Sequence, residues 1–254
     1  MNRTGNHHLV EACAQRGCPV CACLRAAASR HLGAVLAEHV TDPISRERLA
    51  EAWGFCAAHA EALRDMPEVA LGTAIVYQAL VKRACRWLDE TARALGPRDR
   101  RGGWRALVGR PRRAGNQLRS RHERCPVCVE LVAAEAGYLD ALLGGLADPW
   151  LGPAYAGSDG LCLPHLDLAL ARAGAGPAAA RLVDLAREKL GALADDLRRF
   201  IDKHDHRVRP TFTDREAVAW RQALALVAGR VALFGPEMER DGAGDRHPRA
   251  RRRR

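Results

Sequence analysis

Four residues that can bind a metal occur twice in this chain, in the same order. The motif CPVC, a cysteine knuckle, spans residues 18–21 and occurs again at residues 125–128. A CxxH pair follows each knuckle, at residues 56–59 and at residues 162–165. The second copy lies 107 residues after the first at the knuckle and 106 residues after it at the CxxH pair. Chance would have to produce this order twice in register, so the pattern indicates a tandem repeat built around a metal site.

The types and spacing of these residues suit zinc. Two cysteines in a tight CxxC turn direct their thiolates at one point, and a Cys and a His three positions apart share one face of a helix. Three cysteines and one histidine form a common tetrahedral zinc set. The sequence therefore predicts two zinc sites with eight ligands: Cys18, Cys21, Cys56 and His59 in the first repeat, and Cys125, Cys128, Cys162 and His165 in the second.

We expect each repeat to close its own site. The 34 residues between Cys21 and Cys56 would then fold as helices that return the chain to the knuckle, and the metal would clamp a helical hairpin. A site with four protein ligands leaves no open position for water or substrate, which argues against zinc hydrolysis. An iron–sulfur cluster is the alternative cofactor, because thiolates with one histidine can hold one and the spacing does not separate the two.

The composition predicts an all-α fold. Hydrophobic residues make up 48% of the chain and aromatic residues 5%, and Ala, Leu and Arg dominate, which favours helices over strands. Asp42 and Pro43 are typical of an N-cap and a first helical position. Helices are expected at 21–40, from Pro43 to a break at Gly54, 56–66, 68–95, from the second knuckle to 147, 162–173, 177–205 and 213–234, with a Pro/Gly-rich loop at 148–160.

The expected organisation is two pseudo-repeats of a metal-clamped helical unit, followed by a C-terminal helix. Thr213 and Glu216 form the signature of a capping box at the start of that helix. Trp220, with Leu224 and Val227 at helical intervals, is expected to pack the helix against the bundle. The boundaries are 1–97 for the first repeat, 98–122 for a basic linker, 123–210 for the second repeat, 211–235 for the C-terminal helix and 236–254 for a disordered arginine-rich tail.

The positive charge of the chain is unevenly placed. The formal net charge is +10 at pH 7. Residues 98–124 hold ten arginines against two acids, and residues 246–254 hold six arginines and no acid, so the rest of the chain is mildly acidic. Arginine-rich segments can bind nucleic-acid phosphates without sequence preference, and they can also serve only to solvate a linker and a tail. We expect the partner to be a protein or a nucleic acid, bound through the linker and tail.

A second polar cluster lies at the end of the second repeat. It consists of Asp202, His204, Asp205 and His206. Asp202 and His206 lie four positions apart, so they could bind another metal or form an acid–base pair, whereas the simpler interpretation is a solvated helix end.

Three further cysteines have no counterpart in the second repeat. Cys13 and Cys23 flank the first knuckle as possible spare ligands or redox-active thiols. Cys85 is interpreted as a small buried apolar residue.

The N-terminus has no apolar segment typical of a signal peptide. The most apolar long run, residues 69–81, is too short to span a bilayer. We therefore expect a cytoplasmic protein that does not enter a membrane, in which nine cysteines indicate metal binding rather than disulfides.

The two motifs, the segment FIDKHDHR at 200–207 and the terminal TxxExxxW helix together resemble a family of bacterial proteins with tandem CPxC…GxCxxH helical repeats and no assigned activity. The resemblance covers roughly residues 13–235. It implies that residues 203–207 are a shared feature, and it implies no reaction.

Three classes of function fit these observations. The favoured one is a zinc-stabilised helical scaffold that binds a partner. The alternative is an iron–sulfur or thiol-based redox sensor. An enzyme with its site near His204 and His206 is the third, which we favour least, because no phosphate-binding glycine loop, nucleophile elbow or small-molecule substrate can be identified.

Overall fold

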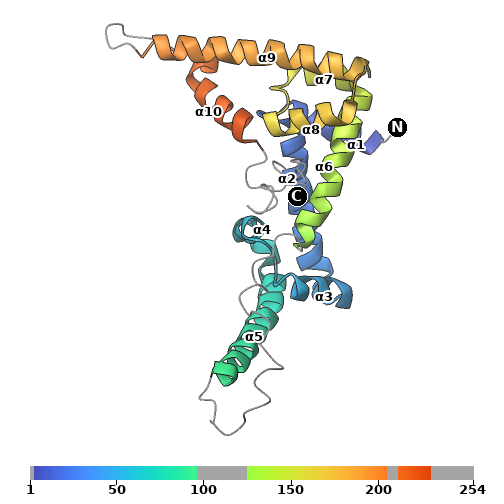
Figure 1. Ribbon diagram of the computed structural model, residues 1–254, viewed down its shortest axis with the longest axis vertical. Coiled ribbons are helices and arrows are strands. Elements are labelled where there is room, and N and C mark those ends of the chain that lie inside the picture. Colours follow the sequence, from blue (N-terminus) through green and yellow to red (C-terminus); the bar gives the residue numbers. More distant parts are fainter. Residues whose placement is uncertain (1–2, 96–124, 205–210, 230–254) are drawn as a thin grey trace, which may run out of the picture. The chain divides into compact units, whose positions relative to one another are not determined.

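The structure, a computed structural model, describes residues 3–95, 125–204 and 211–229 (Figure 1). Every regular element within these three ranges is a helix, so the predicted all-α fold is confirmed. The predicted linker at 98–122 and tail at 236–254 lie outside the described residues.

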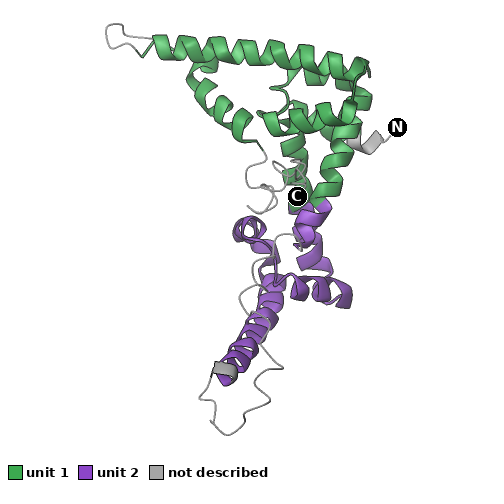
Figure 2. Cartoon of the chain, in the orientation of Figure 1, with its two compact units in different colours: residues 1–28, 131–233 green, residues 29–130, 234–254 purple. Residues whose placement is uncertain are grey.

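The chain forms two compact units (Figure 2). Unit 1 comprises residues 1–28 and 131–233, and unit 2 comprises residues 29–130 and 234–254. Each unit therefore combines segments from both sequence repeats. The domain boundaries expected for the sequence repeats, 1–97 and 123–210, stay a prediction.

Two knuckle helices begin in one unit and end in the other. Helix α2 (Pro19–Gly33) starts in unit 1, and its last residues, from Ser29, belong to unit 2. Helix α6 (Pro126–Gly145) starts in unit 2 and continues in unit 1 from Leu131. The two helices occupy equivalent positions in the sequence repeats. Each carries the chain of its repeat from one unit into the other.

Unit 1 is built around two sets of packed helices. Helix α1 (Arg3–Cys13) packs on α7 (Leu151–Gly157), while α8 (Leu163–Ala173), α9 (Pro177–Asp202) and α10 (Asp214–Ala228) pack on one another (Figure 1). Burial of large apolar side chains is the main driving force for this packing. The most buried of them are Leu9, Leu24, Leu131, Leu139, Leu142, Leu151, Tyr155 and Leu182.

Unit 2 has a smaller core. The π-helical segment η1 (Ala34–Glu38) extends α2, and α3 (Pro43–Glu51), α4 (Ala57–Ala62) and the 3-10 segments η2 (Leu63–Asp65) and η3 (Pro67–Val69) follow. The long helix α5 (Ala70–Leu95) packs on η1, η3 and α3. Asp42 caps α3 as predicted, because its side chain accepts a hydrogen bond from the Ser45 amide at 2.7 Å.

The predicted loop at residues 148–160 is wrong, because α7 lies within it. The Asp148 carboxylate accepts hydrogen bonds from the amides of Trp150 and Leu151, at 2.8 and 3.0 Å, and so caps the helix start. Pro153 lies in the first turn, where its missing N–H leaves no helical hydrogen bond unmade. Asp148 stands 106 residues after Asp42, the same offset as the CxxH pairs, so both repeats kept this short helix.

Helix α10 starts as predicted but packs through a different face. Thr213 and Glu216 form the capping box. Glu216 and Ala219 are buried, whereas Trp220 is 42% exposed and Leu224 is 61% exposed. The expectation that the Trp220 face packs the helix is therefore wrong. The buried Glu216 carboxylate binds Lys203 at 2.6 Å, and this ion pair turns the other face of α10 inward.

One helical segment, Pro19–Glu38, is long and apolar enough to cross a membrane when judged on length and composition alone. The segment is longer than the run at 69–81, and 44% of its most apolar 18-residue window is buried inside the structure. It also carries Cys21, a residue of the first metal centre described below. These features are those of a core helix, so they are weak evidence for a membrane span.

Candidate metal centres

Each knuckle is the start of a helix. Cys18 and Cys125 occupy the positions just before α2 and α6, and their carbonyls accept the first helical hydrogen bonds, from Ala22 and Val129. A proline follows each cysteine at the first helical position, where its fixed φ suits the helix and no N–H is needed. The second cysteine then lies within the first turn, close to the first.

Each CxxH pair has the same local structure. Cys56 is the N-cap of α4 and Cys162 is the N-cap of α8. The histidine lies three residues later and turns Nδ1 toward the cysteine sulfur, at 3.1 Å for His59 and 3.2 Å for His165. The predicted placement of Cys and His on one helix face is therefore confirmed.

The eight predicted residues form two clusters, one in each unit. Within each cluster all four candidate ligand atoms lie within 4.8 Å of one another, and all four residues are buried. Centre 1 in unit 1 consists of Cys18, Cys21, Cys162 and His165, and centre 2 in unit 2 consists of Cys56, His59, Cys125 and Cys128.

The pairing of knuckles with CxxH pairs is crosswise, and the expectation that each repeat closes its own site is wrong. In centre 1 the knuckle of the first repeat lies beside the CxxH pair of the second repeat. In centre 2 the knuckle of the second repeat lies beside the CxxH pair of the first repeat. The fifteen residues of α2 carry the chain about 22 Å away from Cys18. The next helix, α3, has nine residues and is therefore shorter than α2.

The distances within each centre fit a single metal ion. The sulfurs of Cys21 and Cys162 lie 3.7 Å apart, and those of Cys56 and Cys128 lie 3.6 Å apart. Zn–S bonds of 2.3 Å place the sulfurs of a tetrahedral site about 3.8 Å apart. An iron–sulfur cluster divides its thiolates among several irons and needs a wider set, so each centre could hold one ion more readily than a cluster.

The charges in each centre are strongly coupled. Burial opposes protonation of the histidine, but hydrogen bonds with the thiolates outweigh it and raise the pKa of His59 to about 9 and that of His165 to about 11. Hydrogen bonds from Cys162 and Cys18 lower the pKa of Cys21, and those from Cys128 and Cys56 lower the pKa of Cys125. Each centre therefore stabilises one thiolate, the form of cysteine that binds metals, whereas burial raises the pKa of Cys18 in centre 1.

The two centres differ in the hydrogen-bond partner of the histidine Nε2, the ring nitrogen that faces away from the sulfurs. In centre 1 the His165 Nε2–H donates to the Glu135 carboxylate at 2.9 Å, which leaves Nδ1 to face the sulfurs. In centre 2 the buried Nε2 of His59 has no hydrogen-bond partner among the residues that the structure describes. Sequence reasoning missed Glu135, although it lies seven residues after Cys128 on the same face of α6. Its counterpart in the first repeat is Ala28, so the repeat pattern could not reveal it.

The second predicted cluster is only partly described. Asp202 is the exposed last residue of α9. The His204 Nδ1 lies 2.7 Å from the Phe200 carbonyl, and the His204 ring packs against the rings of Phe200 and Phe212, which also contact each other. Asp205 and His206 lie outside the described residues, so a joint role for the four stays a prediction.

The three other cysteines lie in different environments. Cys13 and Cys23 are buried in unit 1, and neither belongs to a centre. Cys85 is exposed on α5, so its interpretation as a buried apolar residue is wrong. The long helix α5 packs on the other helices of unit 2 with only part of its surface. Cys85 lies on the exposed part of the α5 surface.

Within the described residues the chain is all-helical, and each of its two buried Cys₃His clusters combines residues from both copies of the duplicated sequence. The chain belongs to a family of unknown function, DUF6062, whose model matches residues 9–219. No curated protein and no solved structure matches the chain.

Proposed function

We propose that the protein is a zinc-stabilised helical scaffold, with one structural zinc ion in each centre. The observation that supports this most directly is the crosswise pairing of two buried Cys₃His sets. Centre 1 joins Cys18 to His165, and centre 2 joins Cys56 to Cys128. Metal binding at such sites contributes directly to folding, because the unfolded chain holds no preformed site.

A structural role follows from the composition of each centre. Four protein ligands complete a tetrahedral zinc site, so no position is left for water or substrate. The ligand side chains are buried, and removal of the metal would leave uncompensated thiolates inside each unit. The zinc ions would therefore hold the two halves of the duplicated sequence together rather than carry out a reaction.

Metal content and an absorption spectrum of anaerobically purified protein test this proposal. We expect about two zinc ions per chain and no visible absorption. Iron with acid-labile sulfide and a brown colour would contradict the proposal and support the redox-sensor alternative. Less than one metal ion of any kind per chain would contradict both.

We further infer that the scaffold binds a polyanion, of which nucleic acid is the favoured example. Residues 98–124 carry ten arginines against two acids, and residues 246–254 carry six arginines. Binding should weaken as salt is raised, because arginine contacts release counterions from the phosphates. Deletion of residues 246–254 should lower both the affinity and the slope of its salt dependence. A chain that binds neither single-stranded nor double-stranded DNA or RNA at low salt would leave a protein partner as the interpretation.

A further inference from the structure

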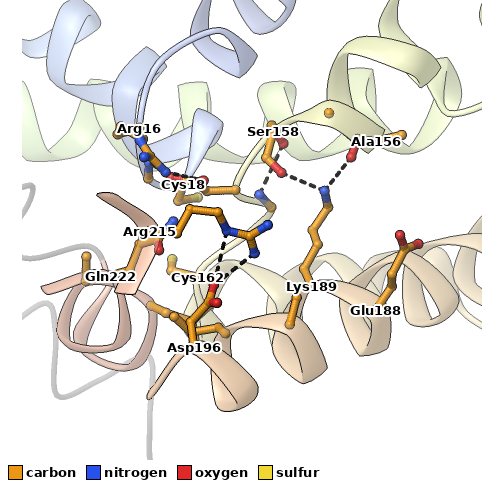
Figure 3. A pocket seen from close by; sticks show the side chains of 18 residues that line it. Arg16, Cys18, Ala156, Ser158, Cys162, Glu188, Lys189, Asp196, Arg215 and Gln222 are labelled. Carbon is orange, nitrogen blue, oxygen red and sulfur yellow. Dashed lines mark hydrogen bonds and ion pairs between the residues drawn. The ribbon is translucent and has the colours of Figure 1, made fainter. Parts of the chain in front are cut away.

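A cavity of about 440 Å³ opens in unit 1, beside centre 1 (Figure 3). Its walls come from the first knuckle, the segment 156–162, and helices α9 and α10. The volume lies in the range of sites that bind small molecules. The apolar part of the wall consists of Ala156, Ala192, Leu193, Ala225 and Leu226.

Two residues of centre 1, Cys18 and Cys162, form part of the cavity wall. Cys18 is 8% exposed, the highest value among the eight residues, whereas no residue of centre 2 exceeds 1%. A small molecule in the cavity would therefore lie beside two residues of centre 1. The residues of centre 2 are almost fully buried from solvent.

Near Arg215 and Arg16 the cavity favours an anion, because Asp196 and Asp159 are occupied there while guanidinium donors remain. Arg215 reaches from α10 into the cavity and binds Asp196 through Nε and Nη2, at 3.1 and 2.9 Å (Figure 3). A guanidinium has five N–H donors, so this pair leaves others for a ligand. Asp196 also accepts a hydrogen bond from Arg199 at 2.5 Å.

Asp159 and Lys189 are occupied as well, whereas the Glu188 carboxylate lies beyond Lys189, on the side of the cavity away from Arg215 (Figure 3). Asp159 accepts hydrogen bonds from the Gly17 amide at 2.7 Å and from Arg16 at 3.5 Å. Lys189 donates to the carbonyls of Ala156 and Ser158, both at 2.6 Å. The remaining donors for a ligand therefore belong to Arg215 and Arg16, which are both exposed.

The C-terminal end of α10 closes centre 1 on another side. Gly229 lies so close to Cys162 that a Cβ on this glycine would meet the sulfur at 2.5 Å. No ligand can enter between these two residues. Among the surfaces that the structure describes, the cavity is thus a route to Cys162 that the fold leaves open.

We propose that this cavity binds small anionic thiols and makes centre 1 the site of metal exchange, while centre 2 retains its metal. The inference rests on the proposed function, since it requires both centres to hold zinc. Arg215 and Arg16 would bind the anionic group of the thiol, which places its sulfur against Cys18 and Cys162. No oxidation is involved. The entering thiol releases one proton, and the cysteine that it displaces takes one up.

Release of zinc from the full-length protein, followed with a colorimetric zinc indicator, tests the inference. The added thiols are mercaptosuccinate, which is anionic, and 2-mercaptoethanol, which is neutral, at equal thiolate concentration. We expect about one zinc ion per chain to leave in a fast phase and the second in a slow phase. The fast phase should be about tenfold faster with mercaptosuccinate, which corresponds to one charged hydrogen bond.

Two matched pairs of variants assign the fast phase to the cavity. Arg215→Gln should remove the advantage of the anionic thiol, because it removes the guanidinium that would bind the anionic group. The fold should be kept, because Arg199 still binds Asp196. Arg221→Gln, on the same helix but outside the cavity wall, should leave the advantage unchanged. Ala225→Met should slow the fast phase by filling the cavity, whereas Ala228→Met should not.

The outcomes separate this inference from the proposed function. Two zinc ions per chain that leave in a single phase would overturn the inference and leave the proposed function standing. A fast phase that Arg215→Gln and Ala225→Met do not alter would overturn it too. A chain that never held two zinc ions would contradict the proposed function itself, and elemental analysis before the kinetic experiment detects this.

Discussion

The Cys18 sulfur and the His165 Nδ1 lie 3.4 Å apart, although 147 residues separate them in the chain. Both atoms belong to centre 1, and the equivalent contact in centre 2 joins Cys125 to His59 at 3.6 Å. Each centre therefore closes a long loop of the chain. A closure of this kind restricts the unfolded chain, so metal binding should stabilise the fold as a whole.

Replacement of Glu135 should weaken metal binding at centre 1 alone. Glu135→Ala removes the acceptor that orients His165, and loss of such a partner lowers metal affinity by about 10–100-fold. Competition with a zinc indicator measures both affinities. Glu135→Gln should recover part of the loss, because its amide oxygen can still accept the hydrogen bond. An equal loss at both centres would show that Glu135 supports the fold rather than the His165 side chain.

A methyl group at Gly229 should destabilise unit 1. The Cβ of Gly229→Ala would overlap the Cys162 sulfur, and the φ of 40° is unfavourable for an L-residue. Overpacking of this kind costs about 1–3 kcal/mol in the free energy of unfolding, measured with urea on the zinc-bound protein.

Gly191→Ala is the matched control for that variant, because its added Cβ meets no atom within 4 Å in the middle of α9. It should stabilise the protein by about 0.5–1 kcal/mol. A Gly229→Ala variant as stable as Gly191→Ala would contradict the close contact between Gly229 and Cys162.

Removal of zinc should leave a protein whose stability depends on pH through His165 and Cys21. Protonated His165 stabilises the folded state fully below its unfolded pKa of 6.5, and this contribution is lost as the pH rises through about 11. The lowered pKa of Cys21 contributes fully above its unfolded value of 9.0, and this contribution is lost as the pH falls.

The two contributions add to a plateau between about pH 6.5 and 9, with lower stability on each side. The measurement is urea unfolding of the chelated protein and of chelated His165→Ala from pH 5 to 11. The plateau is expected in the first protein, and the difference between the two, which reports the His165 contribution, should fall from about pH 6.5 to 11. A difference that keeps rising between pH 9 and 11 would contradict the assignment of the raised pKa to His165.

Loss of the Asp148 cap should destabilise unit 1 by about 0.5–2 kcal/mol. Asp148→Ala leaves the amides of Trp150 and Leu151 without their acceptor at the start of α7. Thermal unfolding of the zinc-bound protein measures the effect. Asp148→Asn, which keeps an acceptor oxygen, should lose less. If the two substitutions were equally mild, α7 would not depend on this cap.

Local features of the fold could be predicted from the sequence, because they depend on neighbouring residues. The caps at Asp42 and Thr213 and the placement of Cys56 with His59 follow from spacings of three residues. Helix α7 was missed because its glycine and proline suggested a loop, although Asp148 repeats Asp42 at the offset of the CxxH pairs.

Long-range features could not be predicted in the same way. The two knuckles have identical sequences, and both CxxH pairs offer the same atoms, so the set of ligands is unchanged when the pairs are exchanged. Only the length and direction of α2 and α6 decide which pair meets which knuckle. Glu135 and the exposed face of Trp220 also depend on how helices pack, which a single sequence with helical periodicity does not specify.

The metal content of two quadruple variants tests the crosswise pairing most directly. The first variant removes all of centre 1, by Cys18→Ser, Cys21→Ser, Cys162→Ser and His165→Ala. The second removes the whole ligand set of the first repeat, by Cys18→Ser, Cys21→Ser, Cys56→Ser and His59→Ala. Elemental analysis should find about one zinc ion per chain in the first variant and almost none in the second. One zinc ion in the second variant and none in the first would show that each repeat closes its own site, and would contradict the crosswise pairing.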